Sequence, residues 1–388
     1  MTQFTSPPTT SRRAITAEEI AENQKIFEEY FDPQYAQSLV KNVVAPINER
    51  YFKCQFIGFE SLPERNNPER PLIYVSNHSG MAFPWDAMVF SGMMFMRQNF
   101  SFHHAVRPLS APMLSQSNLM NPYLIKDFWK RNGAVDATFK NFETMLYYRE
   151  ANIMIYPEGV AGIGKGFNRR YQLQRFATSF VRMALKYQTD IIPYATVNGE
   201  FINPYVYSLP KLNRLVQKVG IPYIPVGFHT ILLLIFPWLF YFALPAQLTY
   251  VMGKRIRPYE WVDKPYDQLS EEDIMEVRDR IKDQMQQELD DAVARFGKKR
   301  FSSGKIIANS LKNILTLNYY APPGWPILFH EHHRRYVKSQ GRPFEMKINF
   351  WSGLKYLFKN PFTIAFYIPL LGWIPLLIRG YRKHRLGN

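Results

Sequence analysis

Apolar runs typical of β-strands alternate with helical patterns through the first three quarters of the chain. The strand-like runs cover residues 51–59, 71–75, 152–156, 191–197 and 247–256. Helical patterns cover 136–150 and 173–187, and a third begins at Ser270. In this third helix the apolar residues recur at i, i+3 and i+4 on an otherwise charged surface, at positions 274, 277, 281, 285 and 289. Strands that alternate with helices in this way predict an α/β domain.

Composition divides the chain into four predicted segments. Residues 1–15 are rich in Ser, Thr and Pro, which is typical of a disordered tail. Thr16 and Glu19 have the spacing of a capping box, which predicts the start of an N-terminal helical segment over 16–50. The α/β domain is predicted over 51–297. From 298 to 388 the chain turns basic and aromatic, and we predict a separate C-terminal region that associates with a membrane.

Charge and cysteine content restrict the class of protein. The formal net charge is +16, and such basic chains usually meet nucleic acid, an anionic membrane or acidic small molecules. Because the basic residues lie beside apolar runs, and no nucleic-acid-binding module is recognisable, we expect an anionic membrane surface and no nucleic acid. Cys54 is the single cysteine, so no intrachain disulfide can form, which fits a reduced cytoplasmic setting.

Two apolar segments suggest how the chain meets a membrane. Thr230 to Leu244 and Phe362 to Ile378 are shorter than the roughly 20 residues that a spanning helix needs, and both contain proline. We therefore predict interfacial or re-entrant segments, and a peripheral or monotopic protein at the cytoplasmic face of a membrane. A buried core helix is the alternative for each. Residues 1–15 contain no apolar stretch typical of a secretory signal.

The candidate chemistry begins at His78, which follows the predicted strand at 71–75 in the sequence Asn77-His78-Ser79-Gly80. Asp86 opens a helical pattern a few residues later, so a turn could bring its carboxylate back toward the imidazole. A neutral imidazole held by a carboxylate is a competent general base for a hydroxyl group. For His78 by itself, a hydrogen-bonded core histidine is the ordinary alternative.

Four sequence blocks in a fixed order resemble the glycerolipid (lysophospholipid) acyltransferase superfamily. The blocks are Asn77-His78 with Asp86, the glycine block around Gly133, a strand that ends in Pro157-Glu158-Gly159, and a strand that contains Pro193. The first block is most similar to the first block of one subgroup of this superfamily. That subgroup includes the bacterial proteins that are described as monoacylglycerol or diacylglycerol acyltransferase-like. The resemblance spans about residues 70–255 and implies a mixed central sheet flanked by helices.

The resemblance also implies a reaction and a set of site residues. His78 would deprotonate an acceptor hydroxyl, which then attacks the thioester carbonyl of an acyl-CoA or acyl carrier protein, and Asp86 would orient the imidazole. Neither a metal nor any cofactor besides the thioester co-substrate is implied. The acceptor would be a glycerolipid such as a lysophospholipid, glycerol phosphate, or mono- or diacylglycerol. By the resemblance, candidate acceptor-binding residues are Gly133, Glu158 and Gly159. Lys165, Arg169 and Arg170 are further candidates, which could supply charge from the next loop although they do not match the family's positions.

The chain departs from the family pattern at two points. Seven residues separate His78 from Asp86, where the family usually has four, and no arginine follows Glu158-Gly159 directly. A neutral or amino-acid-derived lipid acceptor therefore stays open, as does a non-catalytic membrane-associated protein that keeps the fold. An ion pair of Glu158 with Arg169 or Arg170 is the structural alternative for that carboxylate.

Other motifs carry less weight. The glycine-rich stretch 159–166 lacks the Gly-Lys-Ser/Thr ending of a nucleotide-binding loop. The His103-His104 and Glu331-His332-His333 groups lack a matching set of metal ligands, and we predict polar surface or interface positions for them.

Overall fold

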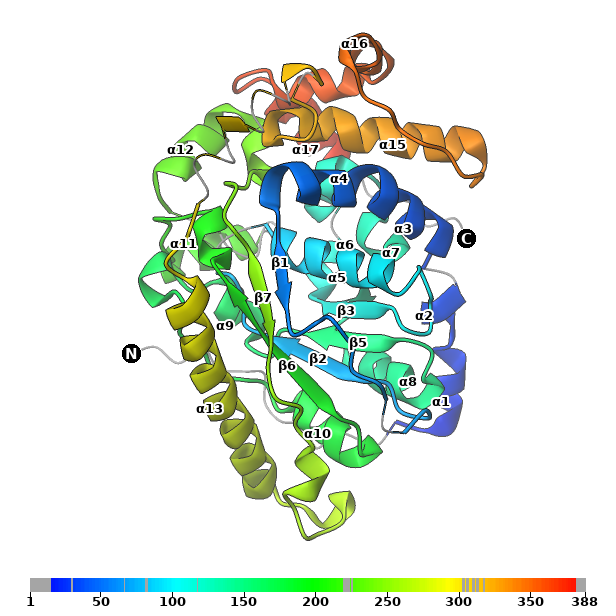
Figure 1. Cartoon of the computed structure of the whole chain (residues 1–388), viewed down its shortest axis with the longest axis vertical. Coiled ribbons are helices and arrows are strands. Elements are labelled where there is room, and N and C mark those ends of the chain that lie inside the picture. The colour runs from blue at the N-terminus through cyan, green and yellow to red at the C-terminus, as the bar shows by residue number, and fades with distance from the viewer. Residues whose placement is uncertain are drawn as a thin grey trace.

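A computed structural model describes residues 15–381 except for 29–30, 66, 81–82, 117, 219–223, 225, 302–303, 305–306, 309–310, 312–313 and 317. At its centre lies a seven-stranded sheet in the order β1-β7-β6-β2-β5-β3-β4 (Figure 1). Neighbouring strands are parallel except for β6 and β7, which are antiparallel. The strands are β1 (Gln55–Ile57), β2 (Ile73–Ser76), β3 (Val106–Ser110), β4 (Val135–Asp136), β5 (Asn152–Ile155), β6 (Ile191–Val197) and β7 (Thr249–Met252). The predicted α/β fold with a mixed sheet is confirmed.

Helices cover both faces of the sheet, so its central strands are buried on both sides. Along β2, Ile73 and Val75 belong to one core cluster and Tyr74 to the other, as the twofold alternation of a strand requires. The first cluster includes α8 (Phe139–Tyr148), α10 (Ser179–Tyr187) and α13 (Glu271–Phe296). The second includes α3 (Pro33–Leu39), α4 (Ala45–Ile47), α5 (Trp85–Arg97), α7 (Phe128–Arg131) and α15 (Trp325–Ser339).

The remaining α-helices of the described chain are short or lie at the edges of the sheet. The N-terminal segment begins with α1 and α2, and α6 follows β3. Around the candidate site and in the C-terminal region lie five more. These helices are α1 (Ala17–Glu22), α2 (Lys25–Glu28), α6 (Pro112–Gln116), α9 (Gly159–Ile163), α11 (Pro210–Gln217), α12 (Phe228–Ile235), α16 (Phe350–Lys359) and α17 (Trp373–Tyr381).

Several predicted elements agree with the structure, and some differ in extent. Thr16 and Glu19 form the predicted capping box, and Ser270 caps α13 in the same way. The helical pattern over 173–187 forms a helix only from Ser179, because residues 172–177 run without regular structure. Strands β3 and β4 were not predicted. Most of the predicted disordered tail, residues 1–14, lies outside the described residues.

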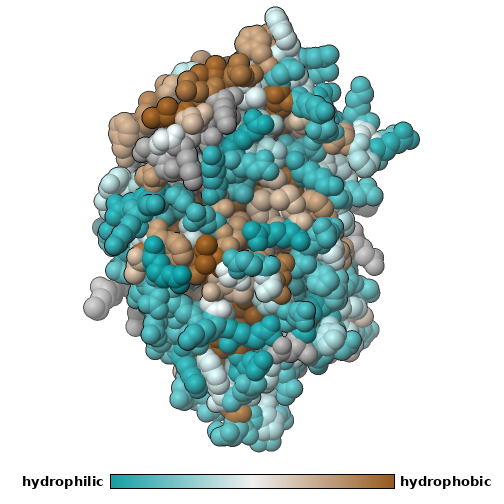
Figure 2. All heavy atoms as spheres, in the orientation of Figure 1, coloured by the Kyte–Doolittle hydropathy of each residue, from teal (hydrophilic) through white to brown (hydrophobic). Residues whose placement is uncertain are grey.

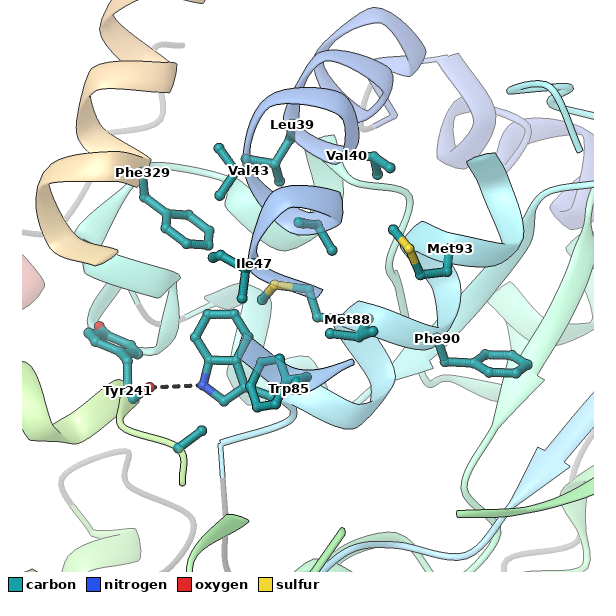
Figure 3. Close-up of a cluster of buried hydrophobic side chains, with 14 of the residues drawn as sticks. Leu39, Val40, Val43, Ile47, Trp85, Met88, Phe90, Met93, Tyr241 and Phe329 are labelled. Atoms are coloured by element: carbon teal, nitrogen blue, oxygen red, sulfur yellow. Dashed lines mark hydrogen bonds between the residues drawn. The ribbon is translucent and has the colours of Figure 1, made fainter. Parts of the chain in front are cut away.

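The C-terminal region shares the core of the α/β domain. Trp325 and Phe329 of α15 are buried in the same cluster as Trp85 of α5, and the rings of Trp85 and Trp325 lie 4.3 Å apart. The indole nitrogen of Trp85 donates a 2.8 Å hydrogen bond to the carbonyl of Tyr241 (Figure 3). Burying aromatic rings of this size stabilises the contact between the two regions by several kcal/mol, at ~25 cal/mol per Å².

The two predicted apolar segments are each broken by proline. The first forms α12 and a 3₁₀ turn, Pro237–Tyr241, and the second forms a 3₁₀ turn, Pro361–Phe366, and α17. Across the described part of the chain, every helix is too short or too polar to cross a membrane.

Candidate active site

His78 lies at the carboxyl edge of the sheet, two residues after β2 ends at Ser76. Its position is set by Asn77, which is buried and binds the neighbouring strand β6. The Asn77 amide donates to the carbonyl of Thr196 at 3.0 Å, and its side-chain oxygen accepts from the Thr196 amide at 2.7 Å. This pair of bonds continues the sheet ladder beyond β2, so the backbone that carries His78 is held rigidly. Ligands commonly bind at this edge of open α/β sheets.

Glu158 holds the His78 backbone from the other neighbouring strand. It follows β5, and its Oε1 accepts a 2.8 Å hydrogen bond from the His78 amide. Its Oε2 accepts from the Gln174 amide at 2.7 Å. With both carboxylate oxygens engaged by backbone amides and only 4% of the residue exposed, Glu158 fixes two loops at the site.

A buried ion cluster of Glu158, Lys165 and Glu200 supports this arrangement. The Lys165 ammonium lies 3.8 Å from Glu158 Oε2 and 3.6 Å from Glu200 Oε1, and its side chain is fully buried. Burial raises the pKa of Glu200, while the charge of Lys165 acts in the opposite direction. Lys165 thus neutralises carboxylates that otherwise would be isolated in the protein interior.

The His78 side chain belongs to the lining of a cavity. Its ring stacks on Tyr156, with centroids 4.3 Å apart and planes inclined by 20°. Burial, followed by the nearby charge of Lys165, lowers the pKa of His78 to about 3. At neutral pH the ring therefore holds a free nitrogen lone pair, which is the form that a general base requires.

Asp86 contacts Ser79 rather than the imidazole. It lies in the first turn of α5, and its Oδ2 accepts a 2.5 Å hydrogen bond from the Ser79 hydroxyl. Burial raises the pKa of Asp86, an effect that the Ser79 bond partly offsets. Within the described residues, His78 and Asp86 form no hydrogen bond or ion pair with each other, and residues 81–82 between them are not among those that the structure describes. In this structure Asp86 orders the loop after His78 through Ser79, a residue that we did not predict.

A cavity of about 500 Å³ extends from His78 into the protein, and its lining is largely apolar. Its walls come from α5, β3 and the N-terminal segment, from Ile155 at the end of β5, and from Tyr156, Pro157, Gly159 and Val160 after it. The other side is formed by α12 and the turn after it, through residues His229, Leu233, Phe240 and Phe242. Such a size and lining are typical of sites for small or elongated apolar ligands.

The two predicted glycines differ in their surroundings. Gly159 lines the cavity with φ of +54°, and a Cβ atom there would meet open space. Gly133 has φ of +91°, and a Cβ atom would lie 2.9 Å from the Phe31 ring. The Gly133 carbonyl accepts a 2.9 Å hydrogen bond from Arg107, so this glycine has a packing role beside the cavity wall formed by Asn132 and Ala134.

Gly162 is a further glycine that the sequence did not single out. A Cβ atom there would lie 2.4 Å from the Glu158 Cβ and 3.0 Å from the His78 Cβ. The close approach of α9 to both residues therefore depends on glycine at this position.

Arg169 and Arg170 are exposed, and neither forms an ion pair with Glu158 among the residues described. The Arg170 guanidinium instead lies over the Phe167 ring, 5.0 Å from its centroid. The charge beside Glu158 comes from Lys165, so the structural alternative of an arginine pair does not hold here.

The Glu331-His332 pair is buried between α15 and α3 rather than on the surface. Glu331 binds Arg334, Arg335 and Asn360, and His332 Nε2 lies 3.0 Å from the Ser38 hydroxyl. The His332 contact attaches α15 to α3, whereas the Asn360 contact attaches it to the end of α16. In the part of the chain that the structure covers, no three His, Cys, Asp or Glu residues are grouped for a metal ion.

Comparisons with known proteins match the same part of the chain. The family model described as Acyltransferase matches residues 53–197, which include His78 and Glu158. Uncharacterized proteins of Mycobacterium bovis and Mycobacterium tuberculosis are each 27% identical over 197 residues, or 50% of this chain and 51% of theirs. One from Mycobacterium leprae is 28% identical over 197 residues, or 50% of this chain and 49% of its own.

These matches cover about half the length of the curated relatives. No solved structure shows a significant match. His78, which follows the end of β2, lies within the residues that the family model matches. Residues 53–197 of this chain are therefore a domain of the acyltransferase family.

Proposed function

We propose that this acyltransferase moves a fatty acyl group from an acyl-CoA or acyl carrier protein thioester to the hydroxyl of a glycerolipid-type acceptor at the cytoplasmic face of a membrane. The observation that carries the proposal is the place of His78 in the lining of a largely apolar cavity of about 500 Å³, where burial lowers the pKa of the imidazole. The cavity suits an acyl chain, and the histidine suits proton removal from an alcohol.

The proposed step needs only the two substrates and His78. The imidazole takes the proton of the acceptor hydroxyl while the acceptor oxygen forms a bond to the thioester carbonyl carbon. The carbon–sulfur bond then breaks, and the imidazolium returns its proton to the leaving thiolate. An ester and a free thiol result. Glu158 acts indirectly, since its carboxylate holds the His78 backbone amide.

The charges at the site favour an acceptor whose reacting end is neutral. Lys165 is already paired with Glu158 and Glu200, so it is not available to hold a phosphate. Arg169 and Arg170 are exposed on the adjacent turn. A mono- or diacylglycerol, or another lipid alcohol, fits these contacts better than glycerol phosphate, and a panel of purified acceptors tests this preference.

The direct test measures thiol release from an acyl thioester by the purified protein. Release is expected only when a lipid that bears a hydroxyl group is present. A thioesterase activity that ignores the acceptor, or no release with any lipid alcohol in the panel, would contradict the proposal.

A non-catalytic protein that keeps the fold is the second candidate. The hydrogen bond of Asp86 to Ser79, rather than to the imidazole, favours it. This candidate predicts that the protein binds lipid without any acyl transfer.

The pH dependence of the reaction should reflect the low pKa of His78. A base whose pKa in the folded protein is about 3 stays neutral above roughly pH 4, so it loses no activity between about pH 8 and pH 5. An unperturbed histidine would lose activity with an apparent pKa near 6.5. The measurement is kcat/KM across this range, with protein stability checked at each pH. A decline centred near pH 6.5 would show that the site does not hold the imidazole in its neutral form.

Substitution of Ser91 by Phe should shorten the acyl chain that the cavity accepts. Ser91 lies on α5 in the cavity wall, and its hydroxyl donates to the carbonyl of Ala87 at 2.8 Å. Excluding four methylenes at ~0.8 kcal/mol each lowers kcat/KM on the order of a hundredfold for a palmitoyl thioester. An octanoyl thioester should react nearly as before. The Ser91→Ala variant is the control, and equal losses for both thioesters would argue against chain binding here.

A further inference from the structure

Two segments far apart in the sequence form one exposed apolar face. Phe228, Ile231 and Leu234 of α12 are between 59% and 75% exposed. Beside them lie Leu370, Leu371, Ile374 and Ile378 of the C-terminal region, between 56% and 68% exposed. The Leu370 amide donates to the Ile235 carbonyl at 2.8 Å, and the Trp373 indole donates to the Leu234 carbonyl at 3.0 Å. We call these seven side chains the apolar face; Figure 2 shows hydrophobic side chains gathered at the upper left, where α12 lies in Figure 1.

The sequence around the apolar face is basic and free of acidic residues. No Asp or Glu occurs between Glu200 and Glu260, or after Glu345. Lys211, Arg214 and Lys218, in and directly after α11, are exposed shortly before α12 begins. On the other segment, Arg379 follows Ile378 and is exposed as well. Apolar side chains with a cationic border complement a bilayer that contains anionic lipid, which attracts each Lys or Arg near its surface.

The apolar face is also the outer side of the cavity wall. On α12, His229 and Leu233 are four residues apart and line the cavity, while Phe228, Ile231 and Leu234 are exposed to solvent. A bilayer on the outer side would therefore lie one helix away from the space that reaches His78.

We propose that the apolar face docks on a bilayer that contains anionic lipid, with α12 inserted at the interface beside the cavity. The docking itself is independent of the chemistry, whereas the delivery of a lipid acceptor past α12 to His78 rests on the proposed function. The proline breaks in both segments fit shallow insertion, because neither segment continues as a helix long enough to cross the membrane.

Flotation of the purified full-length chain with vesicles tests the docking. The protein should float with phosphatidylcholine vesicles that contain phosphatidylglycerol, and much less with pure phosphatidylcholine. The double substitution Ile231→Asp and Leu371→Asp should weaken binding at least a hundredfold, since two aliphatic anchors are lost. The triple substitution Lys211→Gln, Arg214→Gln and Lys218→Gln should weaken it by roughly fivefold per charge, and only for the anionic vesicles.

The control is Tyr147→Asp on α8, which changes a side chain that is 47% exposed and lies far from α12 (Figure 1). It should float like the wild type. The proposal is overturned if the wild type does not float with anionic vesicles, or if the double variant floats equally well. It is also overturned if the apolar face instead joins two copies of the chain, so that the double substitution converts a dimer that does not float into a monomer.

Failure of docking can be told apart from failure of the chemistry. The double variant should still acylate a lipid dispersed in detergent, because Ile231 and Leu371 are not among the residues that line the cavity. Conversely, His78→Ala should float like the wild type. If the wild-type protein floats with vesicles but transfers no acyl group to a lipid dispersed in detergent, the proposed function is rejected and the docking proposal stands.

Discussion

Replacement of His78 by Ala should lower kcat for acyl transfer by roughly 10²–10⁴-fold, which is the contribution typical of a positioned general base. The imidazole belongs to the lining of the apolar cavity, stacks on Tyr156 and is fixed through its backbone by Glu158. Steady-state kinetics with a saturating acyl thioester and a lipid acceptor measure the effect.

The matched control is His104→Ala, which removes an exposed histidine from the same domain. Its activity should equal that of the wild type. Because the substitution also removes the stacking of the ring on Tyr156, the thermal midpoint of His78→Ala is measured beside the kinetics, to show that the variant is folded. Retained activity in this variant would mean that proton removal depends on another group.

Replacement of Lys165 by Met should have the largest effect on stability, roughly 3–5 kcal/mol. The substitution leaves the buried carboxylates of Glu158 and Glu200 without their cation, and Glu200 Oε2 already lacks a hydrogen-bond partner. Urea denaturation at neutral pH measures the loss. The loss should shrink as the pH falls, because burial raises the pKa of Glu200 and a protonated carboxyl needs no counterion.

Two comparison variants separate this effect from a general one. Lys347→Met removes an exposed lysine whose partner is Glu345, and should cost about 0–1 kcal/mol. The double variant Lys165→Met with Glu200→Gln should recover part of the lost stability, since it removes one of the two uncompensated charges. If Lys165→Met were as stable as the wild type, the buried ion cluster would not hold the site together.

The strands β2, β5 and β6 could be predicted because each is buried on both faces and reads as a continuous apolar run. Strand β3 could not, because it contains Arg107, which is 1% exposed. That guanidinium donates from Nε to the carbonyl of Gly133 and from Nη2 to the carbonyl of Ile26, both distant in sequence, while its buried Nη1 has no hydrogen-bond partner in the structure. Burial of a charged residue through such tertiary contacts has no local signal in the sequence.

The candidate site was predictable where family blocks coincide with strand ends. His78 and Glu158 were both predicted as site residues, because each follows a predicted strand within a family block. Their contact was not predicted, since it depends on the parallel pairing of β2 with β5, whose carboxyl ends share one edge of the sheet. The partners of Lys165 and Asp86 could not be assigned. Lys165 reads as an exposed charge in a glycine-rich loop, yet the fold encloses it with Glu200 from the turn after β6. Asp86 accepts a hydrogen bond from Ser79, and the sequence alone does not show that these two side chains meet.

The two apolar segments were recognisable from the sequence as apolar and interrupted by proline, but their meeting on one surface was not. The hydrogen bonds between Ile235 and Leu370, and between Leu234 and Trp373, connect regions more than a hundred residues apart. Such pairings depend on the tertiary fold. The sequence therefore indicates two separate apolar segments, whereas in the structure side chains of both segments form the apolar face.

Mass spectrometry of the lipid product tests the central claim most directly. Wild-type protein, a labelled acyl thioester and a lipid alcohol should yield an acceptor that carries the label in a new ester bond, together with one free thiol for each ester. His78→Ala should yield neither above the uncatalysed background. Equal amounts of labelled ester from both proteins would contradict the assignment of His78 as the base that activates the alcohol.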